Sequence, residues 1–291
     1  MSVAIMTDTN SGISPAEGER YGICVVSMPI IIDDEEFFEY ENITGETLFN
    51  EMNRAKEVRS SQPSIGYVLE MWEKLLNDYD EVVYIPMSSG LSGSYDTANG
   101  FAADFNNRVY VADSHRISVT LYETVFDALQ MSRKGYSGEK IKDEIEKSAY
   151  MSSIYIAVNS LEYLKKSGRV TPAGAAVANV LNIKPVLTIQ GEKLDAYSKV
   201  RSMKQAENRM LQAIQNDIDT RFRDIPANLI RIGAAGTFQN KEKGDEWLKT
   251  TREAFPHHDL YYQQLPCSIA SHVGPDCAGI GVSVINHTRV E

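Results

Sequence analysis

The sequence predicts two domains: an N-terminal α/β domain with a parallel sheet, residues 1–150, and a C-terminal α+β domain with a largely antiparallel sheet, residues 151–291. The 291 residues exceed the usual size of one domain, and 43% of them are hydrophobic, as in ordinary globular proteins. In the first half, short apolar runs alternate with segments of helical periodicity, the pattern of a parallel sheet covered by helices. After about Tyr150, strand-like runs become more frequent and helical ones less regular.

The first half contains clear helix starts between its strands. Ser14-Pro15-Ala16-Glu17 is a capping box with proline at the first helical position. A second helix is expected from Ile65, because Ser64 precedes it and apolar residues then recur every three or four positions to Tyr79. The strands expected here are residues 3–6, 23–26, 82–85 and 109–112.

The second half is richer in strands. Gln190-Gly191-Glu192-Lys193 separates two of them and predicts a β-hairpin. The strands expected are residues 154–158, 185–189, 194–200, 230–233, 260–265 and 280–285, with helices at residues 173–181, 203–217 and 241–255.

Charge and composition exclude several classes of protein. A net charge of −11 argues against nucleic acid binding, which requires a basic face. No apolar run reaches the roughly 18 residues of a membrane span, and the N-terminus lacks an export signal, so we expect a cytoplasmic protein. Cys24, Cys267 and Cys277 form no CxxC pair, and His257-His258-Asp259 is better explained as an exposed turn than as a metal site.

Basic residues gather in one part of this acidic chain. Residues 160–204 contain eight lysines and arginines against three acidic residues, a local balance of +5. Such a segment is either a solvated basic surface or a docking surface for an acidic partner.

The strand at residues 82–85 leads into a loop rich in serine and glycine, Ser88-Ser89-Gly90-Leu91-Ser92-Gly93-Ser94. Glycines let a ligand approach the backbone, hydroxyls donate to its oxygens, and the following helix contributes free N–H groups. An ordinary turn is the alternative. Because loops after parallel strands meet at one edge of a sheet, we expect residues 7–11, 88–94 and 113–118 to converge on one crevice.

Five further segments accompany this loop in a recognisable order. They are Met6-Thr7-Asp8-Thr9, Arg59-Ser60-Ser61-Gln62-Pro63-Ser64, the segment from Leu161 to Val170, Leu181-Asn182-Ile183-Lys184-Pro185-Val186 and Ser271-His272-Val273-Gly274-Pro275. In this order and spacing the chain resembles the DegV family over nearly its whole length. The resemblance implies an α/β domain and an α+β domain with the ligand between them.

The resemblance also implies a function and a site. It implies a carrier, not itself catalytic, that binds a long-chain fatty acid and presents the carboxylate to the catalytic subunit of a fatty-acid kinase. The carrier would then hold the acyl phosphate for phospholipid metabolism. No cofactor and at most transient membrane contact are implied. The implied head-group residues are Ser60, Ser92, Arg201 and His272, with Ser61, Gly90, Gly93 and Ser94 in supporting loops. Hydroxyls, an imidazole and a guanidinium suit a carboxylate, because a desolvated anion needs donors and a counter-charge. Lys165, Lys166 and Arg169 are assigned to partner docking.

Each of these residues also has a structural explanation. Arg201 is alternatively part of the basic surface, His272 a hydrogen-bonded core residue and Ser60 a turn residue. The small residues 173–178, with Leu181 and Ile183, are a candidate wall for the acyl chain, or simply a helix-packing surface.

Two other function classes stay open. One is a hydrolase or phosphotransferase that uses Asp8, Asp113 or Ser92 with the Ser/Gly loop as its anion hole. The other is a sensor of a non-lipid small molecule.

The sequence departs from the family pattern at several positions. Thr9 replaces a serine, Ser167 replaces the first glycine of a Gly-Gly-Arg run, Asp276 replaces a glycine, and the glycines usual after Ser114 are absent. These departures bear on chain preference and partner docking. Asp276 near the head group would repel an anion unless it faced away or paired with a cation.

Overall fold

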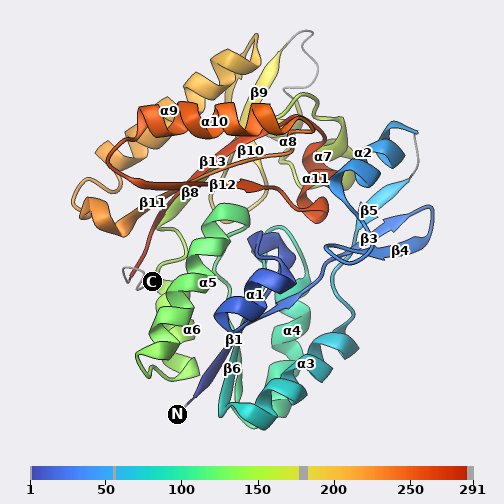
Figure 1. Ribbon diagram of the computed structural model, residues 1–291, viewed down its shortest axis with the longest axis vertical. Helices are drawn as coiled ribbons and strands as arrows, with labels where there is room; N and C mark the ends of the chain where they lie inside the picture. Colours follow the sequence, from blue (N-terminus) through green and yellow to red (C-terminus); the bar gives the residue numbers. More distant parts are fainter. Residues whose placement is uncertain (1, 55–56, 177–182, 287–291) are drawn as a thin grey trace.

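The computed structural model describes residues 2–54, 57–176 and 183–286. A parallel sheet lies in the half of the molecule that contains the N-terminus, and a larger mixed sheet lies in the other half (Figure 1). A third, small sheet lies beside the junction of the two. Within the described residues, no helix is both long enough and apolar enough to cross a membrane.

The N-terminal sheet has four parallel strands in the order β2-β1-β6-β7. All six residues of β1 are buried, because α3 and α4 pack on one face of the sheet and α5 and α6 on the other. The elements of this half are β1 (Val3–Asp8), α1 (Pro15–Tyr21), β2 (Ile23–Val26), α3 (Ile65–Asp78), β6 (Glu81–Ile85), α4 (Ser94–Ala102), β7 (Val109–Val111), α5 (Ser118–Arg133) and α6 (Gly138–Lys147).

The expected strands and helix starts of this half are confirmed. The side chain of Ser14 caps α1 by accepting a hydrogen bond from the Glu17 N–H at 3.1 Å, and Pro15 is the first helical residue. Ser64 precedes α3 without a side-chain cap. Helix α5 was not expected, because 13 of its residues are buried and it lacks the polar face that reveals an amphipathic helix.

The C-terminal sheet has six strands in the order β10-β9-β8-β13-β11-β12. Only the β11–β12 pair is parallel, which confirms the largely antiparallel sheet. Helices α9 and α10 cover its outer face (Figure 1). The elements are β8 (Ser152–Ala157), α7 (Glu162–Ser167), α8 (Pro172–Ala176), β9 (Lys184–Ile189), β10 (Asp195–Val200), α9 (Met203–Asp219), β11 (Ile230–Gly236), α10 (Lys241–Ala254), β12 (Asp259–Gln264), α11 (Cys267–Val273) and β13 (Ala278–Val284).

The third sheet is absent from the sequence-based prediction. Its strands are β3 (Pro29–Ile32), β4 (Glu35–Phe38) and β5 (Val58–Ser60), paired antiparallel in the order β4-β3-β5, and helix α2 (Gly45–Asn53) packs with them. Asp33 and Asp34 form the β3–β4 turn with φ values of +48° and +69°. Aspartate tolerates this left-handed region, so the Asp-Asp pair was the missed hairpin signal.

Helix α5 joins the two halves. It packs against β1 on one side and against β11 and β13 on the other. A Cβ atom at Gly233 would lie 2.5 Å from the Cβ of Val119, and one at Gly281 would lie 2.7 Å from its Cγ2. These two glycines therefore let the first turn of α5 approach the C-terminal sheet closely, beside the space described next.

Candidate functional site

A cavity lies between the two halves and encloses about 880 Å³ of empty space, its open mouth included. The three loops at the edge of the parallel sheet all contribute, through Asn10, Ser92 and Ser118. Apolar side chains form most of the wall: Met28, Met87, Leu91, Ile117, Val119, Ile154, Ile156, Leu164, Ile189, Leu194, Ala235, Leu265, Ile269, Val273 and Ile280.

Ser60 and His272 meet at the polar end of the cavity. The Oγ of Ser60 lies 2.7 Å from the Nε2 of His272, although 212 residues separate them. Ser60 ends β5, and His272 is in the last turn of α11, which packs on β5. Gly274 ends α11 with φ +77°, and a Cβ there would lie 2.6 Å from the ring of Tyr163, so only glycine fits.

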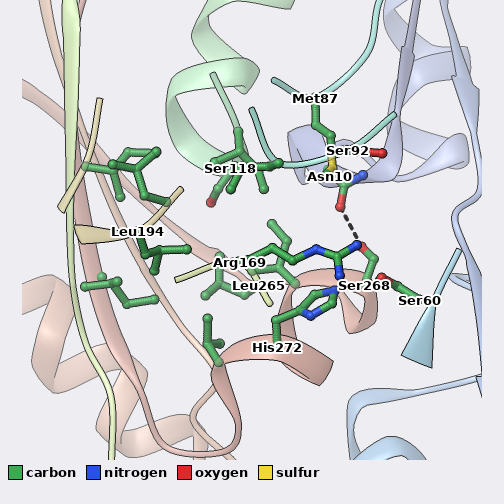
Figure 2. Close-up of a pocket in the computed structure, with 18 of the residues that line it drawn as sticks. Asn10, Ser60, Met87, Ser92, Ser118, Arg169, Leu194, Leu265, Ser268 and His272 are labelled. Carbon is green, nitrogen blue, oxygen red and sulfur yellow. Dashed lines mark hydrogen bonds between the residues drawn. The ribbon is translucent and has the colours of Figure 1, made fainter. Parts of the chain in front are cut away.

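Arg169 brings a positive charge to the same end. It follows Gly168, whose left-handed conformation ends α7. Its guanidinium lies beside His272 and Ser268 (Figure 2). Burial, and then the nearby Arg169 charge, lower the pKa of His272 to about 4, so the imidazole is neutral near pH 7. Among the described residues, the Nδ1 atom of His272 has no hydrogen-bond partner.

Ser268 and Asn10 form the adjacent polar wall. The hydroxyl of Ser268 donates to the Oδ1 of Asn10 at 2.8 Å, the dashed line in Figure 2, and the Nδ2 of Asn10 donates to Asp8 at 2.9 Å. Glu39 accepts the N–H of Ser268 and the hydroxyl of Thr9. Burial is the main cause that raises the pKa of Asp8 to about 6 and that of Glu39 to about 7.

The serine- and glycine-rich loop contributes Ser92 at the start of α4. Its Oγ lies 2.9 Å from the Oγ of Ser94 and accepts the Ser94 N–H at 3.2 Å. Gly90 has a packing role, since a Cβ there would lie 2.7 Å from the Gly191 carbonyl in the β9–β10 hairpin. The loop therefore both lines the cavity and contacts the C-terminal half.

Comparisons with known proteins identify the family. The model of the DegV family, described as an uncharacterised protein family, matches residues 2–284. A DegV domain-containing protein of Clostridium acetobutylicum is 32% identical over 225 residues, which are 75% of this chain and 78% of that protein. The chain belongs to the DegV family. Protein DegV of Bacillus subtilis is 25% identical over 96% of this chain and 98% of its own.

Solved structures of this family share the fold. A DegV family protein from Thermus thermophilus, reported for its fatty acid binding, has a TM-score of 0.87 at 24% identity and covers 98% of this chain and 100% of its own. A stearic acid-binding protein from Eubacterium ventriosum has a TM-score of 0.86 at 21% identity, covering 97% and 98%.

Three of the four head-group residues assigned through the family resemblance line one cavity. Ser60, Ser92 and His272 do so, as does the supporting residue Ser61. The structure places Arg201 outside the cavity. This residue is exposed in the turn after β10, and its backbone N–H donates to the Oε1 of Gln205 at the start of α9. The arginine in the cavity is Arg169.

Arg169 was instead grouped with two surface lysines. Lys165 and Lys166 are exposed on α7, as a docking surface requires, whereas Arg169 is half-buried in the cavity wall. Sequence reasoning placed Asn10 at the crevice only as part of the loop of residues 7–11, and it missed Ser268 altogether. Asn10 had a signal of its own, since it is a polar residue two positions after the end of a buried parallel strand.

The candidate acyl wall also needs correction. Ala173–Ala176, the part that the structure describes as helix, does not line the cavity, and Gly174 packs against Val170 and Leu194. Residues 177–182, including Leu181, lie outside the described residues. Ile183 packs against the buried apolar cluster that contains Val170 and Leu194, but it does not line the cavity.

Three of the four departures from the family pattern have local explanations. Thr9 donates to Glu39 and its Oγ1 accepts the Met28 N–H at 3.0 Å. Ser167 is the last residue of α7, where glycine is not required. Asp276 pairs with Lys243 at 3.4 Å and does not line the cavity, so it does not oppose an anion there. In the described ranges, no group of three or more His, Cys, Asp or Glu residues is arranged to hold a metal ion.

Proposed function

We propose that this protein binds one long-chain fatty acid, presents its carboxylate to a separate kinase and carries the resulting acyl phosphate. The observation that supports the proposal is a cavity whose polar side chains, Ser118 apart, gather at one end and whose remaining wall is apolar. The ligands of two proteins with this fold are consistent with such a cavity, since the Thermus thermophilus structure is described as fatty acid binding and the Eubacterium ventriosum structure as stearic acid-binding.

The two parts of a fatty acid match the two parts of the cavity. Each buried methylene contributes about 0.8 kcal/mol, so a long acyl chain gains roughly 10 kcal/mol before the entropy costs of binding. The carboxylate needs donors and a counter-charge, which Ser60, Ser92 and Arg169 supply. His272 adds a ring that a neighbouring anion would favour in its protonated form.

A surface pocket beside the polar end supports presentation to a partner. It shares Ser60, Arg169 and His272 with the cavity, and its other lining residues include Arg59, Lys166, Glu57 and Glu162. A carboxylate held at these shared residues would be reachable from the surface while the chain stayed buried. This is the arrangement that phosphorylation by a separate kinase requires.

The enzymatic alternative is not favoured by the positions of its carboxylates. Asp8 accepts hydrogen bonds from Asn10 and from the Met87 N–H, and Asp113 accepts from the His115 and Ser89 N–H groups. Neither residue lines the cavity, and among the described residues the hydroxyl of Ser92 contacts Ser94 rather than a base that could activate it. We therefore assign the phosphoryl chemistry to the partner.

We place this function in the cytoplasm, with membrane contact limited to lipid exchange. The thiols of Cys24, Cys267 and Cys277 are free, as in a reducing compartment.

Native mass spectrometry of the protein purified from a bacterial host tests the proposal. We expect one fatty acid per chain, and calorimetry of the delipidated protein should show stearic acid rebinding at micromolar concentration or below. The same preparation should turn over neither acyl esters nor phosphate esters. Absence of both a co-purified lipid and stearic acid binding would overturn the proposal and favour a non-lipid ligand.

A further inference from the structure

One polar group in the cavity is far from the carboxylate-binding end. Ser118, the first residue of α5, is only 6% exposed and lines the cavity. In Figure 2 its hydroxyl points among apolar side chains on the side toward Leu194, apart from His272 and Ser60. Within the described part of the chain, its Oγ has no hydrogen-bond partner.

The neighbouring backbone does not satisfy this hydroxyl. The carbonyl of Ile117 already accepts from the Oγ1 of Thr120 at 2.9 Å and from the Leu121 N–H at 3.4 Å. The Val119 carbonyl accepts from the hydroxyl of Tyr261 at 3.0 Å. Ser118 therefore presents a desolvated donor to the cavity, and such a group is unfavourable until an acceptor reaches it.

The backbone at Ser118 is also strained. Its φ of +55° lies in the left-handed region, which side chains other than glycine, asparagine and aspartate rarely adopt. Strain of this kind concentrates where a fold holds a side chain for a ligand. Glycine would fit this conformation with less strain and leave no unpaired hydroxyl, so the serine is costly unless its hydroxyl is used.

The surroundings restrict the acceptor to a neutral oxygen. Of the described residues that line the cavity, Arg169 and His272 alone are able to carry a positive charge, and both lie at the other polar end. A carboxylate at Ser118 would thus lack a counter-charge. A saturated acyl chain offers no acceptor, and a double bond is only a weak one.

We propose that the preferred ligand is an oxygenated long-chain fatty acid, whose hydroxyl or oxo group, part-way along the chain, accepts a hydrogen bond from Ser118. This inference rests on the proposed function and names its substrate class. The carboxylate would occupy the end formed by Ser60, Arg169 and His272, while Ser118 selects the position of the second oxygen.

Calorimetry with delipidated protein tests this. The ligands are stearic acid and a series of monohydroxystearic acids that differ in hydroxyl position, and the proteins are the parent, Ser118→Ala and Ser118→Gly. We expect at least one hydroxy isomer to lose about tenfold in affinity in both variants, while stearic acid binding changes less than twofold. Ser118→Gly suits the positive φ, which protects the experiment from a folding defect of the alanine variant.

The outcomes separate the two proposals. If stearic acid binds but every hydroxy isomer binds the parent more weakly, and the Ser118 variants do not change their ranking, the inference is wrong and the proposed function stands. If neither stearic acid nor any hydroxy isomer binds the parent, the proposed function itself fails. Ser92→Ala is the matched control, since loss of a head-group donor should weaken both ligand classes by the same factor.

Discussion

At the scale of single residues, we expect charge at the proposed head-group end to be the main determinant of anion binding. Arg169 lines the cavity and Arg201 lies exposed in a turn. Arg169→Ala should therefore weaken stearic acid binding by about 2 kcal/mol, roughly 30-fold, because the carboxylate loses a charged donor. Arg201→Ala, the matched control with the same change in net charge, should leave the affinity within twofold. Calorimetry that gave the reverse order would restore the sequence-based assignment.

His272 should make binding depend on pH. Its pKa is about 4 without ligand, and a bound carboxylate raises it. The protonated ring stabilises the complex fully below the unliganded pKa, and this contribution is lost as pH rises through the liganded value. Affinity for fatty acid should therefore fall as pH rises from about 5.5, where a carboxylic acid is already ionised, towards the liganded pKa of His272, by at most about tenfold per unit.

His272→Gln provides the comparison, because glutamine keeps a donor but does not titrate. Its affinity should vary less with pH over the same range. Identical profiles for the two proteins would mean that His272 stays neutral in the complex.

The sequence could predict part of this site and not the rest. Ser60, Ser92 and His272 lie in short motifs whose order was recognisable without a structure. Arg169 and Arg201 both lie in the basic segment, and which guanidinium turns inward depends on the end of α7 and on the packing of the β9–β10 hairpin. No local pattern carries that information. Ser268 was missed because a serine at the start of a buried helix has no special signal.

At the scale of elements, Glu39 joins three segments distant in sequence. It follows β4, accepts the N–H of Ser268 at the start of α11 and pairs with Thr9 after β1. Helix α11 carries His272 into the cavity wall, so this carboxyl group helps to position a residue of the proposed head-group site. Glu39→Ala should cost about 1–3 kcal/mol of folding free energy, since it leaves buried donors without an acceptor, and should weaken fatty acid binding as well.

Glu39→Gln separates hydrogen bonding from charge. Because the pKa of Glu39 is raised to about 7 in the folded protein, its protonated form favours folding, and this contribution is lost as pH rises from about 4.5 through 7. The melting temperature of the parent should fall between pH 5 and pH 8, and that of Glu39→Gln should fall less. Some decline should remain, because the pKa of Asp8 is raised in the same direction. Equal declines in the two proteins would show that Glu39 stays ionised.

Element prediction succeeded where periodicity was local and failed where burial was complete. Strands β1, β2 and β6 and helices α9 and α10 were expected from their own residues. Helix α5 was not, because both its faces are buried between the two sheets. The small β3–β4–β5 sheet depends on a contact between β3 and β5, which are more than 20 residues apart, and local patterns do not specify such pairing.

At the scale of the whole molecule, two exposed lysines lie on the helix beside the proposed head-group end of an acidic protein. Lys165 and Lys166 are exposed on α7, and Lys166 borders the pocket that opens onto Ser60 and His272. An acidic partner approaching this face would be drawn to the opening that leads to the carboxylate. Steering of this kind changes the rate of association and weakens with salt.

Reversal of these charges tests the docking surface. The double variant Lys165→Glu, Lys166→Glu should slow acyl phosphate formation at least tenfold in a reaction reconstituted with the kinase at low salt, and the difference from the parent should shrink as salt is added. Fatty acid affinity should be unchanged, because neither lysine lines the cavity. The matched control is the double variant Lys249→Glu, Arg252→Glu, which changes the net charge by the same amount. Both residues lie on α10, on the outer face of the C-terminal sheet. If both pairs slowed the reaction to the same extent, net charge rather than a docking surface on α7 would account for the effect.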